Sequence, residues 1–189
     1  MDQRRLPGFD PPEDVARLTA GTAGAHIPGM VIKFEVLGTP APKGSSRAFM
    51  SRGPVPKAIL APSGSKQNQA ALKSWDRSVR ECATEAVAVA TQGNMTAPPF
   101  VDVPLRISIQ FRLSRPAGHY GKKGIKPKAP PWPSKKPDLD KLLRSTKDSL
   151  KGIVYDDDSR IVRVDAEKIY AAVGNEGATI VVERASSFT

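Results

Sequence analysis

The feature that most constrains this chain is an acidic stretch inside a basic protein. Residues 136–162 contain six aspartates and no glutamate, whereas the chain of 189 residues has a formal net charge of +10. Three aspartates are consecutive at positions 156–158, and Asp138 and Asp140 flank one leucine. Two like charges 4 Å apart repel by roughly 1 kcal/mol in water and about 4 kcal/mol near a protein surface. If the fold brings the two groups together, they require a positive partner, and a divalent metal with oxygen ligands is the obvious one.

The sequence around these aspartates predicts a helix between two turns. Pro137 suits a position just outside a helix start, and the carboxylate of Asp138 can accept from the free N–H groups of the first turn. Apolar residues then recur at helical spacing, and Gly152 ends the helix. The members of this apolar face are Leu139, Leu142, Leu143, Thr146 and Leu150. Asp138 and Asp140 therefore project from the beginning of a helix.

The second group of aspartates falls in the connection to the next strand. Residues 153–155 form a short β-prone run, the acidic turn at 156–158 follows, and Ile161 begins a further strand. For the two groups to meet in one cation-holding pocket, this connection must return the chain beside the helix N-terminus. Taken singly, each feature has an ordinary structural explanation, as a helix cap, a first-turn acid or a solvated turn.

Together, the segments KPDLDKLLRSTKDSL and KGIVYDDDSRIV resemble the RusA-type Holliday-junction resolvases. That family carries a DxDN-x-x-K helix start and a later D-D-(A/S)-x-(V/I)-V segment. The resemblance is strong over residues 136–170 and extends weakly over residues 31–184 through the order of the elements. It implies a small homodimeric endonuclease that uses Mg²⁺, with Mn²⁺ as a possible substitute, to nick DNA at four-way junctions.

The resemblance also implies roles for individual acidic residues. By position, Asp138 and Asp140 match the first two metal-binding catalytic aspartates and Asp158 matches the third. Asp157 is the acidic neighbour of Asp158 in the same metal site.

Two positions depart from the family pattern. Arg144 stands where the family usually has a catalytic lysine, and Lys141 stands where it usually has asparagine. Because arginine keeps its charge but does not lose its proton, a phosphate-clamping role transfers to Arg144 and a proton-shuttling role does not. Lys141 or Lys147 would assist Arg144 in stabilising the charged phosphate of the transition state.

Residues 116–136 are basic and rich in proline. They contain six lysines, five prolines and no acidic residue, which makes a packed helix or strand unexpected. One interpretation is a solvated linker. The other is a flexible basic arm that binds DNA phosphates beside the metal site, while Tyr120 and Trp132 stack on exposed bases for about 1–3 kcal/mol each. The lysines of this arm are Lys122, Lys123, Lys126, Lys128, Lys135 and Lys136.

Composition narrows the function classes. The excess of basic residues suits a polyanionic partner. No apolar run reaches the length of about eighteen residues that a membrane span needs, and no signal peptide is visible, so we expect a cytoplasmic protein. The lone cysteine, Cys82, cannot form an internal disulfide, and its apolar helical context predicts a core position. The loop at residues 38–47 lacks Walker spacing, so no nucleotide cofactor is expected.

The remaining pattern predicts an α+β domain with a mixed sheet and two main helices. Residues 1–29 are rich in proline and glycine and are expected to form a flexible tail, which leaves residues 30–189 as the folded domain. A helix over residues 66–91, capped by Ser65, presents the stripe Leu72, Trp75, Val79, Cys82, Ala86 and Val89. Alternating strands are expected at 31–37, 101–113, 162–170 and 179–184, with a hairpin formed by 48–50 and 58–61.

Three functions fit these observations. The first is a junction-resolving nuclease, and the second is a metal-dependent nuclease acting on flaps or forks. The third is a DNA-binding protein whose catalytic site has decayed, which the departures at Lys141 and Arg144 keep open.

Overall fold

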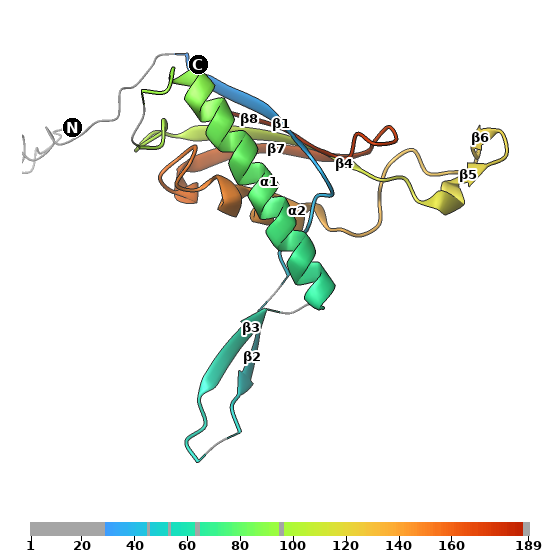
Figure 1. Ribbon diagram of the computed structural model, residues 1–189, viewed down its shortest axis with the longest axis horizontal. Coiled ribbons are helices and arrows are strands. Elements are labelled where there is room, and N and C mark those ends of the chain that lie inside the picture. Colours follow the sequence, from blue (N-terminus) through green and yellow to red (C-terminus); the bar gives the residue numbers. More distant parts are fainter. Residues whose placement is uncertain (1–28, 45, 53, 63–64, 95–96, 187–189) are drawn as a thin grey trace, which may run out of the picture.

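A computed structural model describes residues 29–44, 46–52, 54–62, 65–94 and 97–186, so the predicted N-terminal tail lies almost entirely outside the described residues (Figure 1). The central sheet has the strand order β1-β8-β4-β7. Its strands are β1 (Val31–Leu37), β4 (Leu105–Leu113), β7 (Ile161–Tyr170) and β8 (Gly177–Arg184). β4 runs parallel to β7, whereas β8 is antiparallel to both of its neighbours. This mixed sheet and two helices confirm the predicted α+β class.

Alternation along the strands divides the sheet into a core face and an open face. Ile32, Phe34 and Val36 of β1 are buried, while the residues between them are exposed. The core face continues across the sheet through Ile107, Ile109, Phe111, Ala178, Ile180 and Val182. On the open face, polar side chains pair across strands, as in the 2.8 Å contact between Arg106 and Asp165.

The long helix α1 (Lys66–Ala90) packs on β1 and on the second helix. The Oγ of Ser65 accepts from the backbone N–H of Asn68 at 3.2 Å, as the capping prediction requires. Trp75 and Val79 are buried, and Cys82 is half-buried at the edge of the core. The predicted stripe is wrong at Val89, which is 75% exposed. Val89 follows Val79 by ten positions, which places it about 80° around the helix from Val79.

The second helix, α2 (Leu139–Leu150), lies in the connection from β4 to β7. Its buried side includes Leu142, Thr146 and Leu150, three members of the predicted apolar face. Trp75 Nε1 on α1 donates to Thr146 Oγ1 at 3.1 Å, a buried hydrogen bond that links the two helices. In the part of the chain that the structure describes, neither helix is long and apolar enough to cross a bilayer.

Two expectations about strands differ from the structure, the start of the strand at 101–113 and the β-prone run at 153–155. β4 begins at Leu105 rather than near Val101. Residues 153–155 form part of a turn rather than a strand, although Val154 and Tyr155 are fully buried. The turn is closed by the N–H of Gly152, which donates to the Tyr155 carbonyl at 2.8 Å. Apolar residues in a buried turn resemble a short strand in sequence, because burial and strand formation select the same side chains.

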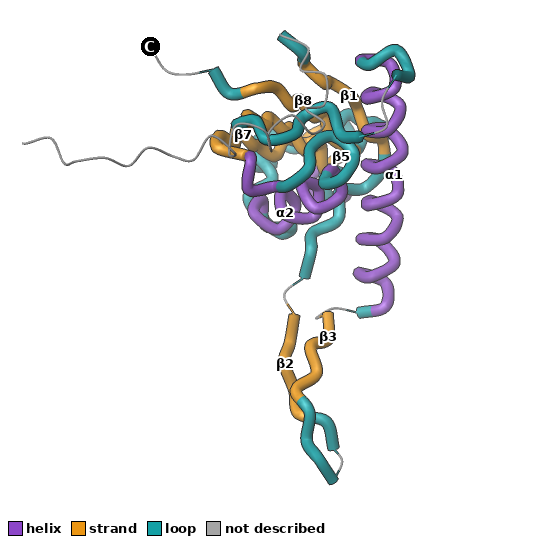
Figure 2. Tube along the Cα trace, turned by 90° about the vertical axis from the view of Figure 1, so that its left-hand side faces the viewer, coloured by secondary structure: helices purple, strands orange, loops and turns teal. Residues whose placement is uncertain are grey.

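Two segments project from the body (Figures 1 and 2). The first is the predicted hairpin, formed by β2 (Ser46–Met50) and β3 (Ala58–Pro62). The second lies within residues 116–136. It contains a 3₁₀ turn, η2 (Ala117–His119), and a small hairpin of β5 (Tyr120–Gly121) and β6 (Gly124–Ile125), where the sequence predicts no regular structure.

Valine-to-alanine substitutions on the buried and exposed faces of α1 should differ in their effect on the free energy of unfolding. Val79→Ala removes buried methyl groups and leaves a cavity, so it should lower the free energy of unfolding by about 2 kcal/mol. Val89→Ala is the matched control and should change it by less than about 0.5 kcal/mol. Urea unfolding followed by circular dichroism measures both, and equal effects would contradict the packing of α1 described above.

Candidate active site

Asp138 and Asp140 lie at the beginning of α2, as predicted. Asp138 is the N-cap residue, but its side chain makes no capping hydrogen bond. Its carboxylate instead pairs with Lys141 at 2.8 Å. The hydrogen bond from Lys141 holds the pKa of Asp138 below its usual value, and the charges of Lys136 and Lys168 act in the same direction. The predicted role of Asp138 as a side-chain cap is therefore wrong, because the adjacent lysine competes successfully for the carboxylate.

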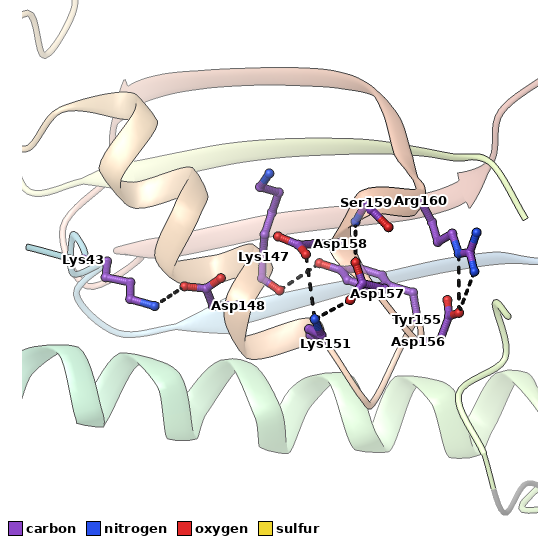
Figure 3. Close-up of polar contacts among 10 residues, drawn as sticks. All are labelled: Lys43, Lys147, Asp148, Lys151, Tyr155, Asp156, Asp157, Asp158, Ser159 and Arg160. Carbon is purple, nitrogen blue, oxygen red and sulfur yellow. Dashed lines mark hydrogen bonds and ion pairs between the residues drawn. The ribbon is translucent and has the colours of Figure 1, made fainter. Parts of the chain in front are cut away.

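The three consecutive aspartates divide between two cations (Figure 3). Asp157 pairs with Lys151, whose Nζ also lies 3.9 Å from Asp158. Asp156 instead faces Arg160, at 3.4 Å. Lys151 lowers the pKa of Asp157, and the backbone N–H of Ser159, which donates to Asp157 at 2.9 Å, adds to the effect. Asp157 thereby caps η3 (Asp158–Arg160), the short turn that leads into β7.

The structure does not gather the two groups of aspartates into the single pocket that the sequence predicts. Among the described residues, no three His, Cys, Asp or Glu side chains come close enough together to hold a metal ion. Asp157 and Asp158 lie near Lys151, at the end of α2 opposite to Asp138.

The physical reason lies in the turn after α2. Tyr155 is fully buried, and its hydroxyl donates to the Lys147 carbonyl at 2.8 Å. Tyr155 also forms a β-bridge with Lys151. These contacts tie the connection to the last turns of the helix, so the acidic turn stays at the end of α2 opposite to Asp138.

A row of cations lies between the two groups. Asp140, Arg144, Lys147 and Lys151 follow one another at spacings of four, three and four, which places them on one side of α2. Arg144 and Lys151 are exposed, and Lys147 is half-buried. We call Arg144, Lys147 and Lys151 the basic ridge. It begins beside the first group of carboxylates and ends at the second.

Three cations that the sequence analysis does not assign belong to this site. Lys43 pairs with Asp148 at 2.5 Å and its N–H donates to the Lys141 carbonyl at 3.1 Å, which fixes the loop after β1 against α2. Lys168 on β7 donates to the carbonyls of Lys135 and Pro137, at 3.1 and 2.9 Å. Lys151 holds Asp157. Of the three, only Lys151 could be found from the sequence, because its spacing places it on the same face of α2 as Lys147. The contacts of Lys43 and Lys168 join segments that are far apart in the sequence.

The basic segment 116–136 leads directly into Asp138. Its base is fixed by the Arg115 guanidinium, which lies 4.0 Å from the centre of the Tyr170 ring. Trp132 is 59% exposed and Tyr120 is 37% exposed. Lys126 donates to the Gly118 carbonyl at 2.8 Å, inside the segment. The other predicted DNA-binding lysines here are exposed: Lys122, Lys123, Lys128, Lys135 and Lys136.

The carboxylates suit magnesium in their chemistry. Mg²⁺ prefers oxygen ligands and usually takes one or two protein carboxylates, with water and substrate phosphates completing its shell. The side chains of Asp138 and Asp158 are 44% and 41% exposed, so both are accessible. The donors are thus of the type that Mg²⁺ binds, and they lie in two groups at opposite ends of α2, Asp138 with Asp140 and Asp157 with Asp158.

Comparison with known proteins identifies the family. The family model described as "Endodeoxyribonuclease RusA" matches residues 55–183, about two thirds of the chain. No curated protein matches the chain. The matched region contains both helices and both pairs of aspartates. With its acidic helix start, its acidic turn and a match of this length, the chain belongs to the RusA family of endodeoxyribonucleases.

Proposed function

We propose that this protein resolves four-way DNA junctions by paired, symmetric nicks, as a magnesium-dependent homodimer. The observation that carries the proposal is the position of the RusA match, which includes every carboxylate of the candidate site and the cations around it except Lys43. The family makes the protein an endodeoxyribonuclease. The junction, the metal and the dimer are the further steps of the proposal.

The cations of the site bind the DNA backbone. The exposed lysines of segment 116–136 act as point charges on phosphates and attract the DNA to the beginning of α2. Tyr120 and Trp132 offer exposed aromatic faces to bases that are unstacked at a branch point. This arrangement delivers a phosphate to the place where Asp138 and Asp140 project.

The proposed magnesium ligands lie at the two ends of α2, Asp138 with Asp140 at its beginning and Asp158 with Asp157 after its end. When bound, the ion activates water and offsets negative charge on the leaving oxygen. Lys141 lowers the pKa of Asp138, and Lys151 lowers the pKa of Asp157, so both lysines favour the ionised form of their partner carboxylate. A carboxylate that is already ionised needs no proton loss before it can bind a cation.

Arg144 is the proposed phosphate clamp. It is exposed on the basic ridge one turn after Asp140, and its guanidinium can bind two phosphate oxygens at once. Lys141 and Lys147 add positive charge on either side of it. These residues stabilise the charge that develops on the phosphate during cleavage.

The dimer is part of the proposal because the family resemblance implies it, and it suits the reaction. One subunit provides one set of carboxylates and therefore one cut, whereas resolution of a four-way junction needs two symmetric cuts. A two-fold dimer presents two identical sites to the two strands.

Two alternatives use the same residues. A nuclease for flaps or forks needs the same carboxylates and differs in the DNA shape that it binds. A decayed junction-binding protein is favoured by one observation, the replacement of the family's asparagine and lysine by Lys141 and Arg144. Cleavage assays on junction, fork, flap and linear duplex in Mg²⁺ separate the three.

Asp140→Asn should abolish cleavage while junction binding persists. The amide keeps the size of the side chain but removes the charge that attracts a divalent cation, and we expect a loss of at least about 100-fold in single-turnover cleavage. Glu81→Gln, on the exposed side of α1, is the matched control and should cleave like the wild type. Wild-type protein that shifts the junction in a gel but never nicks it in Mg²⁺, with EDTA as the blank, would instead identify a decayed binder.

The clamp role of Arg144 predicts an ordered series. Arg144→Lys keeps the charge and restores the residue that the family usually has, so cleavage should remain within about tenfold of wild type. Arg144→Ala should lower the cleavage rate by about 100-fold or more, since one preorganised donor to the charged phosphate is removed. Single-turnover rates at saturating protein separate this effect from binding. Equal rates for the lysine and alanine variants would remove Arg144 from the site.

The segment 116–136 should contribute to binding through charge. In the double variant Lys122→Ala/Lys123→Ala, affinity should fall on junction and duplex alike, and the slope of log K against log salt should fall by up to about 2, at roughly 0.9 for each phosphate that is no longer neutralised. Fluorescence anisotropy at salt concentrations from about 50 to about 200 mM measures both the affinity and its dependence on salt. Unchanged affinity would reduce the segment to a linker.

A further inference from the structure

The β2–β3 hairpin projects away from the body and packs on little except itself. Its strands pair from Ser46 with Pro62 to Met50 with Ala58, and neither makes an extensive contact with another described helix or strand. Both views show the hairpin extending beyond the end of α1 (Figures 1 and 2). Strands of this length reach roughly 17 Å. A two-stranded hairpin alone is only marginally stable in water, so a projecting one is expected to have a partner.

The hairpin nevertheless starts from a fixed point beside the candidate active site. Lys43, three residues before β2, is bonded to α2 through its N–H to Lys141 and its side chain to Asp148. Ser145 Oγ on α2 also donates to the Ala41 carbonyl, at 2.7 Å. The base of the hairpin is thus attached to the helix that carries Asp138, Asp140 and the basic ridge.

The tip of the hairpin combines positive charge with an exposed apolar side chain. Two hydrogen bonds join the residues at its base: the N–H of Ser51 donates to the Lys57 carbonyl at 2.8 Å, and the N–H of Lys57 donates to Ser51 Oγ at 2.9 Å. Arg52 and Lys57 are exposed on either side of Val55, which is 69% exposed. Val55 stands between two prolines, Pro54 and Pro56. An exposed apolar side chain between two cations has the chemistry of a wedge that enters DNA at a base step while its flanks bind phosphates.

Charge selects DNA over a second copy of the chain as the partner. Residues 46–62 contain three cations and no acidic residue, and the chain as a whole carries +10. A second copy would bring the same excess of positive charge to the interface, whereas a DNA strand is neutralised by it.

We propose that the β2–β3 hairpin is a DNA-binding arm that acts on the DNA next to the cut site. Arg52 and Lys57 contact phosphates, and Val55 packs against base faces that branching leaves unstacked. This inference rests on the proposed function for the identity of the DNA. It adds a contact outside both the carboxylate site and the lysines of segment 116–136.

The first test compares two double variants that remove equal charge. Arg52→Ala/Lys57→Ala alters the tip, and Lys73→Ala/Arg77→Ala alters exposed residues of α1. Binding to a fluorescent four-way junction is measured by anisotropy without divalent ions, over a range of salt concentrations. The tip variant should bind about tenfold more weakly, with a salt slope lower by nearly 2, while the α1 variant matches the wild type. Equal behaviour of the two variants would overturn the proposal.

The second test addresses the apolar tip. A junction with 2-aminopurine beside the branch point reports loss of base stacking as increased fluorescence. Wild-type protein should raise this fluorescence, and Val55→Ser should lose the increase while it keeps the wild-type salt slope. A full increase with Val55→Ser would exclude the wedge. Circular dichroism melting should show the same stability for all tip variants, since the altered residues Arg52, Val55 and Lys57 are exposed.

Two controls separate this inference from the proposed function. In an Asp140→Asn background the tip effects on binding should persist, so loss of cleavage alone does not affect the inference. Sedimentation should give the same mass for the wild type and the tip variants without DNA, and a lower mass for the tip variants would instead assign the hairpin to a contact between two copies. A wild type that binds no branched DNA would overturn both proposals, whereas normal junction cleavage with unaffected tip variants would overturn this one alone.

Discussion

The parallel pairing of β4 with β7 determines where the candidate site lies. Two parallel neighbours cannot be joined by a tight turn, so the chain must cross back over the sheet between them. Here the crossover runs from residue 114 to residue 160 and contains the basic segment, α2 and the acidic turn. Every residue that the sequence assigns to metal or DNA binding, from Tyr120 to Asp158, lies on this one connection. The sheet and α1 serve to hold it, through the burial of Leu142, Thr146 and Leu150 against the core.

Within that connection, lysines pair with two of the carboxylates that the sequence analysis assigns to a metal ion. Asp138 and Asp157 are each bonded to a lysine on or next to α2, and the pKa of each carboxylate is lowered as a result. The positive charge of these lysines offsets the repulsion between neighbouring carboxylates. Such lysines can exchange a carboxylate for a phosphate when DNA arrives, because an exposed ion pair contributes only about 0–1 kcal/mol to stability.

The sequence allowed prediction of the parts that local periodicity controls. α2 begins after Asp138 and buries the predicted face, and the strands alternate as expected, because residues close in the chain decide both. The return path of the acidic turn could not be predicted in this way. It depends on the Tyr155 hydroxyl reaching the Lys147 carbonyl and on Phe100 forming a β-bridge with Tyr155, and the second of these joins segments more than fifty residues apart. The absence of Val89 from the buried stripe has a similar origin, since only the position of the sheet decides how wide that stripe is.

The folded unit extends beyond the region that matches the family. The match begins at residue 55, yet β1 lies before it and pairs along its whole length with β8. Ile32, Phe34 and Val36 of β1 are in the core. Gly177 at the start of β8 is adapted to this neighbour, because a Cβ there would lie 1.9 Å from the Val36 carbonyl oxygen, so a larger residue would force the strands apart. The requirement for glycine at position 177, inside the matched region, thus comes from β1, which lies outside it. The same continuity links Lys43 to α2, and it makes β1 and the loop after it part of the structure that positions the candidate site.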